Sequence, residues 1–342
     1  MISKTQKQFL KIIILIIFLT TLLTSITLLT YQRPILQDNT ITLIPDKTGI
    51  WTSNNEIHSS VYIWSSTKNK TNLEQLEKIG IKNIFLHEDV FIQASQSSPK
   101  EKELKIWLKE ANQHNIKVHI WINCFHTTTD GWIQAHTTEG ETRKKEVLNN
   151  ITQYLKTYQP HIQGIHLDYI RYQKDAYNTP GGYENAANNI TDFIKQTRTT
   201  IKKQNPTIIL SGALMIDEVN NNKEDGYYYG QDYSEMAKYL DVIVPMIYTD
   251  SPEFIKHTLV NISQDVTGTG VQIWPAIATY SVENNTFLDY THLDNSIQAS
   301  LVGGSQGYVL FREALISDEV KNSNGFNTMR NLNIFERLIL QY

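Results

Sequence analysis

The sequence contains a single cysteine, Cys124, among 342 residues. One thiol cannot form an intramolecular disulfide, and it cannot supply a cysteine-rich zinc or iron–sulfur site. A chain of this length buries enough apolar surface to fold without such a staple. Charged residues make up only 19% and the net charge is −4, whereas binding to phosphates needs a basic surface. We therefore expect no nucleic acid as a partner.

Acidic residues are absent from the first 33 positions. Three lysines precede residues 12–30, a run of apolar, Thr and Ser residues that is long enough to cross a bilayer. Lysines on the amino side predict a cytoplasmic N-terminus and a single-pass protein of the cell membrane, with the rest of the chain outside. A cleaved signal peptide, which would give a secreted protein, is the alternative, although the run is long for one.

The rest of the chain is expected to form a short stalk and one domain. Because the anchor segment, residues 1–33, holds four basic residues, the remainder has 27 basic and 35 acidic residues and a net charge of −8. Residues 34–55 are polar and lack periodic apolar positions, which is typical of a stalk. Residues 56–342 are then available for a single domain.

Short β-branched segments alternate with helical patterns from residue 58 onward. The eight predicted strands span residues 58–65, 81–87, 116–125, 162–170, 207–215, 242–248, 271–280 and 307–311. Helix signals lie between them, such as Thr71-Asn72 before an apolar helical pattern, Gly80 after it, and Ser98-Pro99 before the next. Eight such units favour a (β/α)8 barrel. An open doubly wound sheet is the alternative, but no glycine-rich phosphate loop follows the first strand.

The fourth predicted strand is the most informative one for chemistry. Side chains alternate along a strand, so His166 and Asp168 share one face while Ile165 and Leu167 share the other. The apolar pair is expected to pack on helices, which places His166 and Asp168 inside the barrel. A carboxylate in that position must be paired or used, and Arg171 at the strand end is a possible partner. Asp168 is therefore the first candidate for a catalytic residue.

Polar and aromatic residues also follow the other predicted strands, at the end of the barrel where active sites lie. Asp217 and Asp250 are the candidates for a second catalytic carboxylate, and Asp217 ranks first because it continues the inward alternation of the fifth strand. Tyr and Trp rings stack on sugars, and carboxylates serve as acid and base. The predicted substrate-binding residues are His166, Arg171, Tyr172, Asn123, Trp121, Tyr248, Trp274, Tyr280 and Arg312.

No metal or cofactor is expected. The sequence lacks a His-Glu-x-x-His motif or a similar ligand spacing. A hydrolase of another bond, such as a deacetylase or peptidase that uses His87 and His126, remains a third option.

Three segments resemble those of uncharacterised glycoside-hydrolase-like barrel families: Asp-Tyr-Ile-Arg at 168–171, Val-His-Ile-Trp-Ile-Asn at 118–123 and Val-Pro-Met-Ile-Tyr at 244–248. The resemblance implies a (β/α)8 fold and action on a polysaccharide. More distantly, the chain is similar to family 18 chitinases, whose fourth strand reads Asp-x-Asp-x-Glu. The corresponding positions here are His166, Asp168 and Ile170. The catalytic glutamate of that family has no counterpart, so its mechanism is not implied.

Two functions remain open on the sequence. The first is a membrane-anchored glycoside hydrolase that acts outside the cell on a cell-surface or extracellular polysaccharide. The second is a non-catalytic barrel that binds glycans or serves as a cell-wall scaffold, which the isoleucine at position 170 favours. The two differ in whether a second carboxylate stands near Asp168.

Overall fold

The computed structural model describes residues 57–217, 228–281, 284 and 286–328. They belong to one compact unit, Thr52–Tyr342. The predicted anchor at residues 12–30 and the stalk at 34–55 lie outside the described residues. Among the helices of the described part, none is long and apolar enough to cross a membrane.

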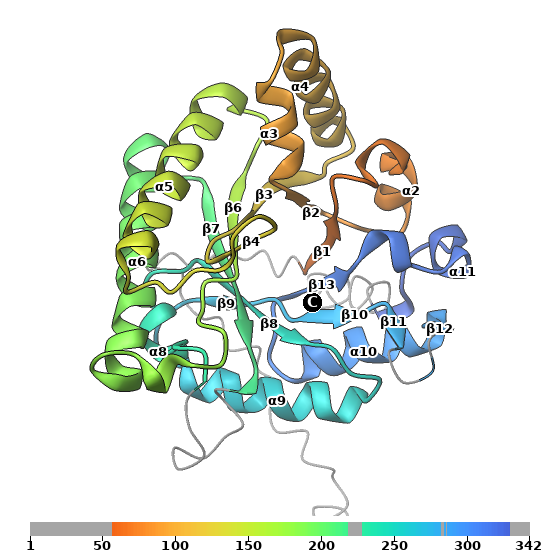
Figure 1. Cartoon of the computed structure of the whole chain (residues 1–342). Coiled ribbons are helices and arrows are strands. Elements are labelled where there is room, and N and C mark those ends of the chain that lie inside the picture. Colours follow the sequence, from red (N-terminus) through yellow and green to blue (C-terminus); the bar gives the residue numbers. More distant parts are fainter. Residues whose placement is uncertain (1–56, 218–227, 282–283, 285, 329–342) are drawn as a thin grey trace, which may run out of the picture. The chain divides into compact units, whose positions relative to one another are not determined.

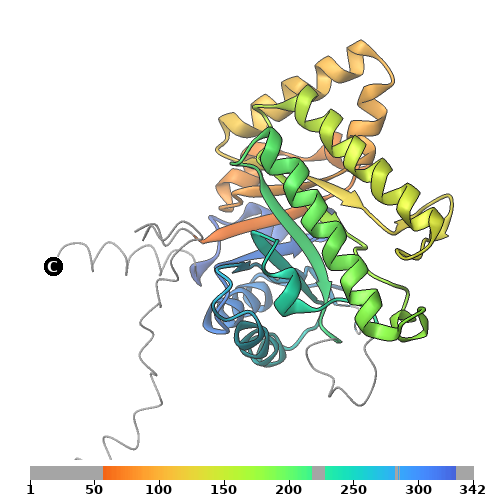
Figure 2. The same cartoon turned by 90° about the vertical axis from the view of Figure 1, so that its left-hand side faces the viewer.

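Parallel strands close into an eight-position barrel (Figures 1 and 2). In chain order these strands are β1 (His58–Ile63), β2 (Asn83–His87), β3 (Lys117–Asn123), β6 (Gly164–Asp168), β7 (Ile209–Met215), β8 (Val242–Ile247), the pair β9 (Gln272–Ile273) and β10 (Ala276–Ala278), and β13 (Gly307–Phe311). Closure comes from the parallel pairing of β13 with β1. The predicted (β/α)8 barrel is thereby confirmed.

The seventh strand position differs from the expected single strand at residues 271–280. Its two halves, β9 and β10, both pair with β8, and Trp274 and Pro275 separate them. Proline has no N–H group to donate to a ladder, so the hydrogen bonding of the strand is interrupted there.

Helices surround the strands, as Figure 1 shows. They are α2 (Leu73–Lys78), α3 (Asp89–Ser95), α4 (Ser98–Gln113), α5 (Thr138–Tyr158), α6 (Gly182–Gln204), α8 (Tyr233–Met236), α9 (Pro252–Asp265), α10 (Tyr290–Val302) and α11 (Asp318–Asn322), with 3-10 turns η1 (Lys68–Lys70), η2 (Ala176–Asn178) and η3 (Glu313–Leu315). Two hairpins complete the described elements: β4 (His126–Thr127) with β5 (Gly131–Trp132), and β11 (Tyr280–Ser281) with β12 (Thr286–Phe287).

Local sequence signals account for several helix ends. The side chain of Asn72 accepts a hydrogen bond from the backbone N–H of Gln75 at 3.0 Å, which satisfies a free donor of the first turn of α2. Gly80, just after that helix, has a φ of 89°, a conformation that glycine adopts without strain. The prediction that this helix lies between Asn72 and Gly80 is confirmed.

The core has an outer and an inner part. Ile165 and Leu167 of β6 belong to the outer cluster, between strands and helices. Inside the barrel, His166 is fully buried and stacks on Phe85 at 4.5 Å. The inner apolar cluster consists of Tyr62, Phe85, Trp121, Val242, Val244, Trp274, Ala276 and Val309. The alternation expected in the fourth strand is therefore present.

Candidate functional site

Asp168 ends β6 at the carboxyl end of the barrel, which faces the viewer in Figure 1, and only 9% of it is exposed. Its Oδ2 accepts a hydrogen bond from Nε1 of Trp121 at 3.0 Å, and its Oδ1 accepts one from the backbone N–H of Tyr169 at 2.6 Å. Burial raises the pKa of Asp168, while these two hydrogen bonds and the charges of Arg171 and His126 oppose the shift. The net effect favours the protonated carboxyl, the form that a general acid needs.

Tyr169, the next residue, has an unusual backbone conformation. Its φ is 50°, in the left-handed region that is sparsely populated by residues other than glycine. Its ring stacks on His126 at 4.8 Å and meets Trp132 at 5.5 Å, both from the β4–β5 hairpin. Backbone strain of this kind clusters at functional sites, so Tyr169 marks this wall of the mouth as a candidate binding surface.

Arg171 is surrounded by three aromatic rings. Its guanidinium carbon lies 4.5 Å from the ring centre of Trp132, 5.1 Å from that of Tyr229 and 5.3 Å from that of Tyr169. Burial lowers the pKa of Arg171, and the charges of Asp168 and Asp217 both oppose this shift. The charges of both first-ranked carboxylates of the sequence therefore act on the Arg171 guanidinium, although it forms no ion pair within 4.0 Å with either of them in the described part of the chain.

His166 lies below this mouth in a chain of hydrogen bonds. Its Nε2 is 2.8 Å from the hydroxyl oxygen of Tyr62, and its Nδ1 is 2.9 Å from that of Ser211. Burial lowers the pKa of His166 well below its usual value, so the ring is neutral. Because it is fully buried, His166 supports the floor of the site and does not reach a ligand at the mouth.

Tyr248 and Arg312 form another part of the mouth. Tyr248 is 42% exposed and its ring lies 5.0 Å from that of Phe311. Burial around its hydroxyl group, followed by the charge of Asp168, raises the pKa of Tyr248. The Arg312 guanidinium lies 5.8 Å from the ring centre of Trp64, and the Phe311–Arg312 peptide is cis.

Asn123 ends β3 beside Asp168, its partner in the strand register. Its Nδ2 lies 3.3 Å from Nε2 of His87. Its Oδ1 is buried and has no hydrogen-bond partner within the described residues, so this oxygen is an unsatisfied acceptor beneath the surface of the mouth.

Asp250 and Tyr280 lie beside the β11–β12 hairpin. Ser281 donates a hydrogen bond from its hydroxyl to Oδ2 of Asp250. The ring of Tyr280 meets that of Phe287 at 5.7 Å. Both predicted residues are thus placed with the loop that follows the seventh strand position.

Besides His166, two more of the predicted substrate-binding residues do not line the mouth. Trp274 is fully buried and stacks on His58, the first residue of β1, at 4.6 Å, so it lies toward the end of the barrel where the strands begin. Tyr172 is buried in the outer core, and its hydroxyl oxygen lies 3.4 Å from Nδ1 of His136. Alternation along a strand predicts which face a side chain is on, but it does not predict how far along the barrel axis that side chain lies.

Sequence reasoning missed three aromatic residues of the mouth. Trp64 continues the inward alternation of Tyr62 beyond β1, so this signal was available in the sequence. Trp132 lies in a loop hairpin, and Tyr169 follows the strand in a left-handed conformation. No pattern in the sequence predicts the direction of the last two side chains.

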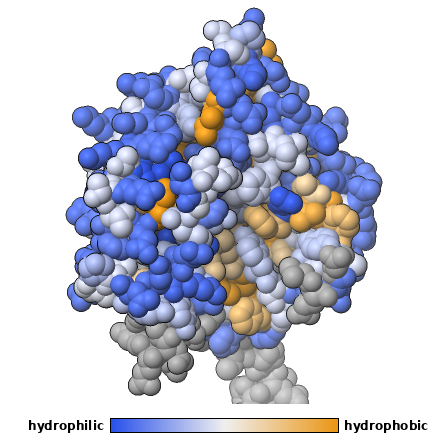
Figure 3. Space-filling model, in the orientation of Figure 1, coloured by the Kyte–Doolittle hydropathy of each residue, from blue (hydrophilic) through white to orange (hydrophobic). Residues whose placement is uncertain are grey.

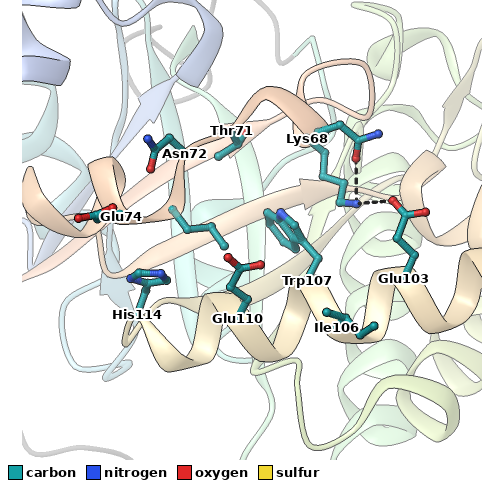
Figure 4. Close-up of a pocket in the computed structure, with 11 residues that line it drawn as sticks. Lys68, Thr71, Asn72, Glu74, Glu103, Ile106, Trp107, Glu110 and His114 are labelled. Atoms are coloured by element: carbon teal, nitrogen blue, oxygen red, sulfur yellow. Dashed lines mark hydrogen bonds and ion pairs between the residues drawn. The ribbon is translucent and has the colours of Figure 1, made fainter.

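The described residues show no metal-ligand cluster, and a surface hollow lies away from this mouth. In the described ranges, no group of three or more His, Cys, Asp or Glu residues could hold a metal ion. A hollow of about 650 Å³ lies between α2 and α4 (Figure 4), on the outside of the barrel. Its buried cation, Lys68, already lies 3.8 Å from a Glu103 oxygen and 5.5 Å from the ring centre of Trp107. This charge is therefore satisfied without a ligand.

The mouth itself is a mixed surface. In Figure 3, which has the orientation of Figure 1, pale and orange residues gather in the middle and right of this face, and hydrophilic residues surround them. Such a mixture of apolar and polar groups is typical of sites for ligands with both kinds of surface, among them sugars.

Comparison with known proteins agrees with this geometry. Among curated proteins, none matches the sequence significantly. Among solved structures, the chain is similar to the glycoside hydrolase domain of PgaB (BpsB) from Bordetella bronchiseptica, with a TM-score of 0.56 and 11% identity over 78% of this chain and 95% of that one. It is also similar to the chitinase of Chromobacterium violaceum, with a TM-score of 0.54 and 12% identity over 78% and 97% of the chains.

A third similar structure is the spore cortex-lytic enzyme SleL of Bacillus megaterium, with a TM-score of 0.54 and 12% identity over 81% of this chain and 76% of that one. At such low identity these three likenesses show the fold. The sequence profile of one family, described as glycosyl hydrolases family 18, matches residues 51–286, which is more than half of the chain. The chain therefore belongs to glycosyl hydrolase family 18.

Proposed function

We propose that this protein hydrolyses a cell-surface or extracellular polysaccharide, with Asp168 as the general acid. The observation that carries the proposal is the state of Asp168: it lies at the carboxyl end of the barrel, is nearly buried, and has a raised pKa. The names of the three similar structures, a glycoside hydrolase domain, a chitinase and a spore cortex-lytic enzyme, support a glycan polymer as the substrate class.

In the proposed mechanism, protonated Asp168 donates its proton to the glycosidic oxygen as the bond to the leaving group breaks. Asp217 is the first candidate for the second carboxylate and Asp250 is the second. A separation of about 5 Å from Asp168 gives a covalent intermediate and retention, whereas about 6.5–9.5 Å leaves room for water and gives inversion. Arg171, whose pKa the charges of both Asp168 and Asp217 influence, would favour the charged form of the two carboxyl groups electrostatically.

Replacement of Asp168 tests this assignment. The Asp168→Asn variant of the full-length protein cannot donate the proton, so release of reducing ends from a responsive glycan should fall by about 10²–10⁴-fold. An asparagine can accept from only one of the two N–H groups of Trp121 and Tyr169, so circular dichroism must show that the fold persists. The exposed Asp318→Asn is the matched control. Unchanged turnover in Asp168→Asn would contradict the role of Asp168.

A non-catalytic glycan-binding barrel is the second candidate, and the position of Ile170 favours it. Ile170 occupies the position of the family's catalytic glutamate, and its side chain is fully buried in the outer core. Its Cδ1 lies 2.9 Å from the point that a Cβ at Gly212 would occupy. A glycan array with turnover assays separates the two functions: tight binding of a glycan that is never cleaved supports the second.

We also propose that residues 12–30 anchor the protein in the cell membrane with the barrel outside. The length of the run and the lysines before it support this proposal. An anchored chain should sediment with membranes, keep its N-terminal peptide in mass spectrometry, and be cleaved by protease added to intact cells. A soluble chain that begins after residue 30 would identify a cleaved signal peptide instead.

A further inference from the structure

Glu88 is a buried carboxylate that the proposed mechanism does not use. It follows β2 directly, is 5% exposed, and lies on the outer side of the barrel wall, between β3 and α5. His87, its neighbour, faces the other way and stacks on Trp64 inside the barrel at 4.6 Å. Any effect of Glu88 on the site therefore passes through the wall of the barrel.

Glu88 and Arg143 hold the last residues of β3 from outside. Oε1 of Glu88 accepts a hydrogen bond from the backbone N–H of Asn123 at 2.8 Å, and its own N–H donates to the carbonyl oxygen of Trp121 at 2.8 Å. Arg143, on α5, donates from Nε to the carbonyl oxygen of Cys124 at 2.8 Å and from a terminal nitrogen to that of Asn123 at 2.5 Å.

The same end of β3 holds Asp168 from inside. The indole of Trp121 donates to the Asp168 carboxylate, and the backbone N–H of Cys124 donates to the carbonyl oxygen of Asp168 at 2.8 Å. The next N–H, of Phe125, donates to the carbonyl oxygen of Tyr169 at 3.1 Å. The segment that Glu88 and Arg143 fix on one side is thus the segment that places Asp168 on the other.

We propose that Glu88 and Arg143 are positioning residues for Asp168, and that they act through the carboxyl end of β3. The proposal rests on the function proposed above only in that Asp168 is the reacting group there. Glu88 does not touch the reacting atoms.

The charge of Glu88 makes this clamp sensitive to pH near neutrality. Burial raises the pKa of Glu88 to about 7, and the hydrogen bond from Asn123 and the charge of Arg143 oppose the shift. The other groups that face it are Asp89 on its own segment, Glu146 and Tyr154 on α5, and Cys124, which directly follows β3. Below pH 7 the protonated carboxyl attracts Arg143 and the Asn123 N–H less strongly, so the end of β3 is held less firmly.

The indole N–H of Trp121 reports on this coupling without any substrate. Full-length protein labelled with 15N-tryptophan gives one indole signal for each tryptophan, and Trp121→Phe assigns the signal of Trp121. We expect the chemical shift of this signal to change with pH in one step, with a midpoint near pH 7. The step should be absent in Glu88→Gln. It should remain in Asp168→Asn, because that variant removes only the titration of Asp168.

Glu146→Gln is the matched control, because Glu146 also pairs with Arg143, at 2.9 Å, but is exposed, and within the described residues it forms no hydrogen bond to β3. It should keep the step and move its midpoint only slightly to lower pH, because the charge of Glu146 adds to the raised pKa of Glu88. A step near pH 7 that survives in Glu88→Gln, or that vanishes in Asp168→Asn, overturns the proposal. If Glu88→Gln does not fold, Arg143→Lys serves instead: it keeps the charge but loses the planar fork from which two different nitrogens donate to the two carbonyl oxygens, so it should displace the Trp121 signal.

Because these signals are read without substrate, a failure of the clamp and a failure of the proposed hydrolysis are distinguishable. Where a glycan is cleaved, Glu88→Gln should flatten the pH profile of kcat near neutrality and leave KM within about twofold. A purely structural role for Glu88 would lower stability without changing this profile.

Discussion

At the scale of single residues, two N–H donors decide how Asp168 behaves. Burial by itself favours the neutral carboxyl, and the hydrogen bonds from Trp121 and Tyr169 favour the charged form. The pKa of the Asp168 carboxyl is therefore raised by less than burial alone would raise it. The proposed chemistry therefore depends on the indole as well as on the acid.

Trp121→Phe tests this dependence. Phenylalanine removes the donor to Oδ2 and keeps an aromatic ring, so the pKa of Asp168 should rise further. A general acid must be protonated, so activity falls as pH rises through its pKa, and the descending limb of the kcat profile should move to higher pH. A limb that stays in place, or moves to lower pH, would show that Trp121 does not stabilise the charged form of Asp168.

At the scale of elements, the mouth combines neighbouring segments with one from farther along the chain. Asp168 ends β6, β3 supplies Trp121, and the β4–β5 hairpin supplies Trp132. The segment before α8 adds the ring of Tyr229 beside Arg171. Helix α5 follows this hairpin and carries Arg143 to the back of β3. Its first turn is capped by Thr137, whose Oγ1 accepts a hydrogen bond from the backbone N–H of Gly140 at 3.1 Å.

Thr137→Ala should destabilise the protein by about 1 kcal/mol, because it removes the cap and leaves a backbone donor of α5 unsatisfied. Thr142→Ala, in the same helix, is the matched control. Thr142 is exposed, and alanine has the higher helix propensity, so this change should be neutral or slightly stabilising. Urea denaturation of both variants measures the difference, and equal stabilities would contradict the capping role.

At the scale of the whole barrel, buried titratable groups set the response of stability to pH. Burial lowers the pKa of His119 to about 3 and also lowers that of His166. Below pH 6.5 the unfolded chain binds protons at these positions and the folded chain does not, so stability falls as pH falls. The pKa of Glu88 is raised, so between about pH 7 and 4.5 the folded chain binds a proton there and the unfolded chain does not. This group therefore increases stability as pH falls.

Each such histidine should lower the free energy of unfolding by up to about 1.4 kcal/mol per pH unit below pH 6.5. Glu88 and Asp168, whose pKa values are raised, oppose this loss, so the contribution of one histidine is measured as a difference between two proteins. In denaturant titrations between pH 6.5 and 5, the His119→Gln variant should lose less stability on acidification than the unchanged protein. Equal slopes in the two proteins would contradict the expectation.

Most of the fold could be predicted because its signals are local. Strand β13 has the predicted bounds, residues 307–311. Helix α2 lies between Asn72 and Gly80, as expected. Less of the site could be predicted from the sequence. Asp168 and Asn123 are at the mouth as alternation indicated, whereas Trp274 has the right face but lies at the wrong end of the barrel. The position of a side chain along the barrel axis depends on the register of the strands, and a single sequence does not predict that register.

The sequence by itself determined the alternation of strands and helices, the inward face of His166 and Asp168, and the absence of a glutamate at position 170. Each follows from the period of a strand or from the identity of a residue. Only the tertiary structure decided that Arg171 lies among three rings, and that Glu88 reaches the end of β3. Apart from the contact of Arg171 with Tyr169, these contacts join residues 35 to 58 positions apart, and closure of the barrel brings such residues together.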